Sequence, residues 1–149
     1  MKVLIVHHLE MTWCDGYAMH YTSFDQEAEK LLQYLEDNNY CYDRIILTLF
    51  ENWELQPEHY YTGLAEHIDE VHTYGYGWTE ETVENSLDNI EWIEGGCHSD
   101  FLPIYDWIKN LKGHEVHLCG AFDGECIDDM ETALAGAEVE YKRISELIV

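Results

Sequence analysis

A cysteine at the start of a helix is the residue of this chain with the clearest capacity for chemistry. Cys126 follows the stretch Gly-Ala-Phe-Asp-Gly-Glu, where the pattern of a strand changes into that of a helix. The positive end of a helix dipole favours a thiolate over a thiol, and the thiolate is the nucleophilic form. The pattern therefore indicates a candidate nucleophile. It is equally typical of an inert cysteine packed beneath a strand end.

Two histidines, His7 and His8, follow the first apolar segment of the chain. A neutral imidazole, with a free pKa of about 6.5, can accept the proton of a thiol near neutral pH. A Cys–His pair is a recognised arrangement for activating a thiol. Because successive strand residues point to opposite faces, we expect at most one of the two rings in a cleft with Cys126. The alternative is a strand end with two hydrogen-bonded imidazoles.

Residues 120–127, Gly-Ala-Phe-Asp-Gly-Glu-Cys-Ile, resemble the strand-to-helix turn of the isochorismatase-like cysteine hydrolases, which reads Gly-Val-Ala-Thr-Asp-x-Cys-Val. The spacing from glycine to cysteine is the same in both. The resemblance implies that Cys126 is the nucleophile and that the main-chain amides around Glu125 and Cys126 form an oxyanion hole. It also implies that Phe122, Asp123 and Glu125 lie beside the substrate.

Three further segments follow in the order of that family. Residues 4–19, 48–59 and 93–101 resemble, in turn, the opening of nicotinamidases, the stretch Asp-Trp-His-Pro-x-x-His, and a Lys-Gly stretch followed by Ser-x-Phe. Trp13 and Trp53 are among the matched positions, and aromatic rings on such loops can wall an apolar pocket for a planar ligand. Otherwise they seal loops or a subunit contact. The resemblance implies a small amide or related planar substrate.

The chain departs from the family at several functional positions. The family's catalytic aspartate falls on His8, and its catalytic lysine falls on Glu94. A glutamate in place of the lysine would raise the pKa of a neighbouring thiol, whereas a lysine would lower it. The resemblance therefore implies a catalytic group of Cys126, His8 and Glu94, in which His8 takes the role of the base.

The metal-binding positions of the family are only partly kept. The metal-binding aspartate and the first histidine fall on Asn52 and Glu54, whereas His59 matches. Carboxylate and imidazole groups are ligands of zinc, so Glu54 and His59 are candidate ligands of a divalent metal such as Zn²⁺. Four other histidines are expected at the surface or at helix ends: His20, His67, His72 and His114.

The elements that must position these residues alternate between strands and helices. Apolar and β-branched runs predict strands at 2–6, 44–49, 90–93 and 116–119, with a last strand within 138–149. Apolar residues at helical spacing predict helices around 28–35, 61–68, 104–111 and 127–134. This alternation predicts an α/β fold in a single domain, 1–149: a three-layer αβα sandwich with a mainly parallel central sheet, isochorismatase-like by the resemblance. Ligands bind such sheets beyond the carboxyl ends of the strands.

The charge of the chain is extreme, because 31 acidic residues against 7 basic ones give −24. Such a surface repels nucleic acid and anionic lipid, so we expect direct binding to neither. Solubility or adaptation to a salty setting accounts for this charge. The alternative is a mimic of nucleic acid that occupies a basic protein partner.

The cysteine spacing and the apolar runs indicate where in the cell the protein is expected. The five cysteines are irregularly spaced and include no CxxC, which indicates neither a disulfide framework nor a zinc knuckle. The longest apolar run, Val3–Val6, is far shorter than the ~20 residues of a membrane span. The first residues also lack the pattern of a secretory signal. The expectation is a cytoplasmic protein that binds no membrane.

Two functions remain open at the level of the sequence. The first is a diverged isochorismatase- or nicotinamidase-like cysteine hydrolase. The second is a catalytically inactive relative that binds a small molecule or a basic protein. The resemblance also implies a tendency to form homo-oligomers.

Overall fold

The structure is a computed structural model, and it describes residues 1–9, 24–49, 64–73, 91–94 and 105–149. The elements in chain order are β1 (Lys2–His7), α1 (Phe24–Asp37), β2 (Arg44–Leu49), η3 (Ala65–His67), β3 (Glu70–Thr73), β4 (Glu91–Glu94), η4 (Asp106–Leu111), β5 (Glu115–Gly120), α4 (Cys126–Gly136) and β6 (Tyr141–Ile148). The elements labelled η are 3-10 helices.

The strands of the described residues form one six-stranded sheet in the order β4-β3-β2-β1-β5-β6. Each neighbouring pair is parallel. From β1 the chain builds outward through β2, β3 and β4, and it then returns to place β5 on the other side of β1. The order of the strands therefore reverses between β1 and β5, which is where doubly wound α/β proteins bind their ligands.

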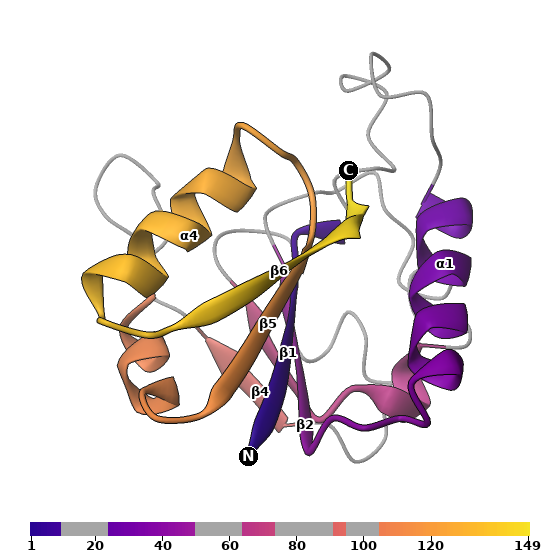
Figure 1. The fold of residues 1–149 in the computed structure, drawn as a ribbon, viewed down its shortest axis with the longest axis horizontal. Coiled ribbons are helices and arrows are strands. Elements are labelled where there is room, and N and C mark those ends of the chain that lie inside the picture. Colours follow the sequence, from indigo (N-terminus) through magenta and orange to yellow (C-terminus); the bar gives the residue numbers. More distant parts are fainter. Residues whose placement is uncertain (10–23, 50–63, 74–90, 95–104) are drawn as a thin grey trace.

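Helices cover both faces of this sheet (Figure 1). On one face the apolar stripe of α1, which includes Leu31 and Leu35, packs against Leu4, Val6 and the same-face residues of β2. On the other face η4 and α4 pack against the alternate residues of the strands, including Val3. The predicted α/β fold with a parallel sheet is confirmed, and within the described residues it has three layers.

Several predicted elements lie where the patterns place them. The strand expected at 44–49 is β2, and the helix expected around 127–134 is α4, with Ile127, Met130 and Leu134 buried. The helix α1 ends just before Asn38, whose side-chain amide donates to the Tyr34 carbonyl at 2.8 Å. The main-chain amide of Asn38 donates to the same carbonyl at 3.1 Å, so this residue bonds twice to the last turn of the helix.

Other elements differ from the prediction. The helices expected around 61–68 and 104–111 are, in their described parts, the short 3-10 helices η3 and η4. In η4 the Ile108 amide donates to the Tyr105 carbonyl, a bond across three residues. A 3-10 helix also brings residues i and i+3 to one side, so the apolar spacing alone does not distinguish the two helix types. The strand β3 was not predicted, and β6 starts at Tyr141.

The structure also bears on the membrane prediction. No helix in the part of the chain that it describes combines the length and the apolar character needed to span a bilayer.

Candidate functional site

The carboxyl end of β1 carries a buried histidine that faces the layer of α4 and η4. His7 is fully buried, and its Nδ1 lies 2.7 Å from the hydroxyl oxygen of Thr48 on the neighbouring strand β2. The ring of Tyr105, next to η4, meets the His7 ring edge to face, with the centroids 5.7 Å apart. Parallel register places His7 opposite Thr48, so adjacent strands fix this hydrogen bond.

His8 stacks on His7 and does not point to the opposite face. The two ring centroids lie 3.7 Å apart with planes inclined by 21°. The alternation of a strand ends at His8 because its φ of 50° lies in the left-handed region, and its amide donates to the Thr48 carbonyl at 3.1 Å. The strand alternation on which the expectation of a single ring beside Cys126 rested therefore does not extend to His8, and the two imidazoles lie together.

Burial keeps both imidazoles uncharged at neutral pH. Loss of hydration lowers the pKa of His7 to about 3, although the main chain of Cys126 acts in the opposite direction. Burial also lowers the pKa of His8 far below its ordinary value, and the neighbouring His7 adds to this effect. This influence means that the main chain of Cys126 lies beside His7.

The turn between β5 and α4 approaches β1 closely. Gly120 lies opposite His7 in the register, and the Ala121 amide donates to the His7 carbonyl at 2.9 Å. A Cβ atom on Gly120 would lie 1.9 Å from the His7 carbonyl oxygen. A glycine is therefore required here, because only a residue without a Cβ lets β5 approach the end of β1 this closely. The following peptide bond, Ala121–Phe122, is cis.

Cys126 is the first residue of α4, as the pattern predicts, and its thiol is half-buried. Two carboxylates, Asp128 and Asp129, lie in the same first turn, and the Asp128 carboxylate accepts a bond from the Gly124 amide at 3.1 Å. Both carboxylates compete with a thiolate for the positive end of the helix. The dipole therefore favours a Cys126 thiolate less than the sequence pattern alone suggests.

The amides expected to form an oxyanion hole are partly engaged. The amides of Glu125 and Ile127 both donate to the Phe122 carbonyl, at 3.1 and 3.2 Å. In this conformation the Glu125 amide can meet a substrate oxygen only by sharing or leaving that bond. The Cys126 amide lies between these two in the same turn.

The residues predicted beside the substrate have different surroundings. Phe122 is fully buried and packs with Ala121 and Val149, whereas Asp123 and Glu125 are exposed. The Asp123 carboxylate forms an ion pair with Arg143 of β6. Phe122 thus anchors the turn on its buried side, and the Asp123 and Glu125 carboxylates lie on its solvent side.

Glu94 is the last residue of β4, the edge strand furthest from β5. Four strand spacings separate β4 from β5, which corresponds to roughly 19 Å across the sheet. The backbone of Glu94 therefore lies far from the start of α4. The main chain of Cys126, in contrast, lies beside His7, on which His8 stacks.

The other predicted site residues, Trp13, Trp53, Glu54 and His59, lie outside the described residues. Within the described ranges, no cluster of three or more histidine, cysteine or acidic side chains has the geometry of a metal site. The zinc hypothesis therefore rests on the sequence alone.

Two neighbours of the site were not predicted from the sequence: Thr48 and Tyr105. Thr48 occupies the position opposite His7 in β2, and only the strand register reveals it.

His72, expected at the surface, is buried in β3, where its ring stacks on Trp107 with centroids 4.2 Å apart. That expectation is wrong because residues 70–73 form an internal strand of the sheet.

Comparisons with protein-family models, with curated proteins and with solved structures found no match to this chain. The class that the fold defines is a doubly wound parallel α/β protein, with its half-buried cysteine at the point where the strand order reverses.

Proposed function

We propose that this protein is a diverged isochorismatase-like cysteine hydrolase that acts on a small amide or related planar substrate. The observation that supports the proposal most strongly is the position of Cys126. Cys126 begins α4 with a half-buried thiol at the reversal of the strand order, and its main chain lies beside His7, on which His8 stacks. Sites at this reversal are typical of doubly wound α/β proteins.

In the proposed mechanism the Cys126 sulfur attacks the substrate carbonyl, and His8 accepts the thiol proton. His7 is a positioning residue: Thr48 holds its Nδ1, and its ring stacks on His8. The tetrahedral oxygen would lie near the amides of the 122–126 turn. His8 then gives its proton to the amide nitrogen as the C–N bond breaks and ammonia or an amine leaves. Water finally hydrolyses the thioester, which releases the carboxylic acid and restores the Cys126 thiol.

One observation favours a second candidate, a small-molecule binding protein without catalysis. Burial and the neighbouring His7 hold the pKa of His8, the proposed base, well below its ordinary value. A thiol of ordinary pKa therefore gives its proton to this imidazole only at a cost in free energy. A binding role would use the same turn and the same rings without any proton transfer.

Alkylation kinetics distinguish the two candidates. In a Cys41→Ser background, iodoacetamide should label Cys126 at least about tenfold faster in the folded protein than in urea, because neighbouring dipoles and imidazoles activate the folded thiol. His8→Asn should slow this labelling more than His7→Asn does. Peptide mass spectrometry assigns the label to each cysteine. A folded Cys126 that reacts no faster than the unfolded thiol contradicts the hydrolase proposal.

Turnover is the second test. Release of ammonia from nicotinamide and benzamide should depend on Cys126 and should be lost in Cys126→Ser. If these amides instead raise the melting temperature equally in Cys126→Ser and in the unmodified protein, without release of ammonia, the binding candidate is the correct one.

A further inference from the structure

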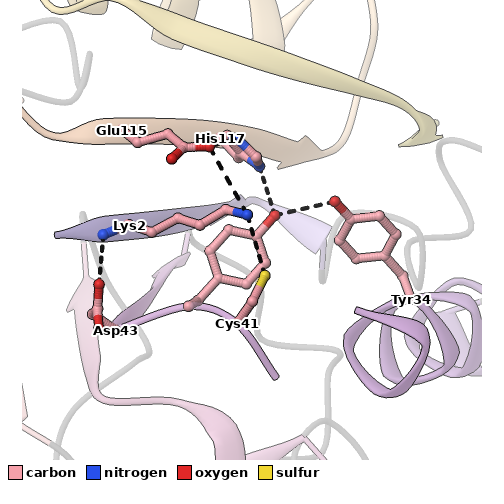
Figure 2. A network of polar contacts seen from close by, with 7 residues as sticks. Lys2, Tyr34, Cys41, Asp43, Glu115 and His117 are labelled. Atoms are coloured by element: carbon pink, nitrogen blue, oxygen red, sulfur yellow. Dashed lines mark hydrogen bonds and ion pairs between the residues drawn. The ribbon is translucent and has the colours of Figure 1, made fainter. Parts of the chain in front are cut away.

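A second cysteine, Cys41, lies at the end of the sheet where the strands begin, whereas Cys126 follows the carboxyl end of β5. Cys41 is exposed on the connection between α1 and β2, and Lys2 starts β1 beside it. The Lys2 ammonium nitrogen lies 3.2 Å from the Cys41 sulfur (Figure 2). A strand of six residues separates Lys2 from the histidine pair, roughly 17 to 20 Å, so this pair is distinct from the candidate site.

Several contacts hold the Lys2 side chain at this place. Its ammonium lies 3.9 Å from a Glu115 carboxylate oxygen and 5.1 Å from the centre of the Tyr42 ring. Its main-chain amide donates to Asp43 at 2.7 Å. Tyr42 is itself fixed, because its hydroxyl lies 2.7 Å from the Nδ1 of His117. The approach of Lys2 to Cys41 is thus built into the junction of β1, β5 and the segment before β2 (Figure 2).

The pair has the properties of an oxidation-sensitive thiol. An ammonium group beside a cysteine stabilises the thiolate, which is the form that peroxides oxidise. The hydrogen bond with Cys41 is the main cause that raises the pKa of Lys2, so the lysine is charged beside the sulfur at neutral pH. Cys119 offers a contrast, because it is buried and its burial raises the pKa of its thiol.

We propose that Cys41 and Lys2 form a covalent sulfur–nitrogen cross-link when a peroxide oxidises Cys41. In the first step the Cys41 sulfur attacks the peroxide: one oxygen joins the sulfur to give a sulfenic acid, the O–O bond breaks, and the other oxygen leaves as water. The sulfur loses two electrons and the peroxide gains them. Sulfenic acids condense with a thiol or with a main-chain nitrogen, and here the Lys2 amine lies 3.2 Å from the sulfur.

In the second step the Lys2 ammonium loses a proton to solvent, and the free amine attacks the oxidised sulfur. The S–O bond breaks, a second water leaves, and a sulfenamide joins Sγ to Nζ with no further change in oxidation state. In total, thiol, amine and hydrogen peroxide give the sulfenamide and two molecules of water. The cross-link ties the start of β1 to the segment before β2, and a thiol reductant reverses it.

Hydrogen peroxide and mass spectrometry test this proposal on the full chain. After treatment, a digest should contain a peptide that joins residues 2 and 41 and is lighter by two hydrogens, about 2 Da, than its two parts together. Dithiothreitol should separate the parts. Cys41→Ser should give no such peptide.

Two variants separate activation of the thiol from the cross-link itself. Lys2→Arg keeps the cation but offers no amine, so Cys41 should still oxidise, with dimedone trapping its sulfenic acid, and no joined peptide should form. Lys2→Met removes the cation and should slow oxidation of Cys41 at least about threefold. Lys30→Arg, on the exposed side of α1, is the matched control and should behave as the unmodified protein does.

Either of two results overturns the proposal. One is a dimedone adduct on Cys41 of the unmodified protein with no joined peptide. The other is oxidation of Cys41 at the same rate in Lys2→Met as in the unmodified protein.

Discussion

At the carboxyl end of β1, His7 and His8 have exchanged contact with water for contact with each other and with Thr48. The Nδ1 of His7 lies at hydrogen-bond distance from Thr48, and the main chain of Cys126 lies beside the ring, but neither offsets the loss of hydration. A buried imidazole without a charged partner is stable while it is neutral. The uncharged state of the pair is therefore a property of the fold, and it links folding to pH.

This linkage predicts a loss of stability in acid. The ordinary pKa of 6.5 applies to His7 in the unfolded chain, whereas in the folded protein burial lowers it to about 3. Between these values the unfolded chain binds a proton that the folded protein does not. The free energy of unfolding should therefore fall as the pH is lowered from 6.5, by up to about 1.4 kcal/mol per pH unit and about 5 kcal/mol in total from His7. Urea unfolding at several pH values measures it.

The variant His7→Asn isolates this contribution. Between pH 7 and 5 the free energy of unfolding of this variant should depend less steeply on pH than that of the unmodified protein. The difference in slope should correspond to about one bound proton. The comparison is made above pH 5 because the many carboxylates begin to titrate below it. Equal slopes for the two proteins in this window would contradict a buried, neutral His7.

The sequence predicts the positions of these residues better than their relations. Cys126 begins a helix, as its neighbours indicate. The stacking of His8 on His7 depends on the positive φ of His8, which a sequence does not specify for a histidine. The hydrogen bond of His7 to Thr48 depends on strand register. For these reasons the histidine pair could be proposed from the sequence, but its arrangement could not.

Among the elements, β3 shows why a strand can be missed. Its residues Glu70-Val-His-Thr73 lack the apolar run that identifies a buried strand. Glu70 is nevertheless buried, because the Arg44 guanidinium and the His72 ring bond to its carboxylate. Burial alone would raise the pKa of Glu70, but these two partners outweigh it and lower that pKa. A strand that buries a paired carboxylate in place of an apolar side chain lacks the apolar signature of a buried strand.

The approach of β5 to β1 predicts the effect of a single methyl group. In Gly120→Ala the new Cβ would meet the His7 carbonyl oxygen at 1.9 Å, and φ at this residue is +125°. Either the strands separate or the backbone changes its conformation. We expect the substitution to cost at least about 3 kcal/mol of unfolding free energy, measured by urea denaturation.

Two other glycines provide matched controls. Gly113 has a φ of +87° and open space around its Cβ direction, so Gly113→Ala carries only the backbone strain, about 1 to 2 kcal/mol. Gly136 ends α4 with open space and no left-handed φ, so Gly136→Ala should be neutral or slightly stabilising. If Gly120→Ala costs no more than Gly113→Ala, the close contact with His7 is not the reason for the glycine.

For the whole molecule, the alternation of strands and helices was sufficient to predict a parallel α/β fold. The order of the strands was not predictable in the same way, because local patterns identify elements and not their neighbours. The additional strand β3 also moves β4 one position further from β1. As a result Glu94 lies far from Cys126, although the two positions follow the order of the resembled family.

The charge of −24 is the other property of the whole molecule. Five of the seven basic residues already form an ion pair with a carboxylate: Lys2, Lys30, Arg44, Lys112 and Arg143. Most of the 31 acidic groups therefore cannot be neutralised by a base. Repulsion among like charges favours expanded states of a chain, and added ions weaken it.

Salt should therefore stabilise this protein. Raising potassium chloride from about 0.01 M to about 1 M shortens the screening length from about 30 Å to about 3 Å, which removes most of the repulsion between separated acids. The same screening weakens the exposed ion pairs, such as Lys112–Glu138, but each of these contributes little. We expect a rise in melting temperature over this range, measured at pH 7.5, where both buried histidines stay neutral.

Replacing exposed acids such as Glu66 and Asp106 with amides should reduce the rise, because fewer charges remain to be screened. A melting temperature that falls with potassium chloride would mean that the ion pairs outweigh the repulsion.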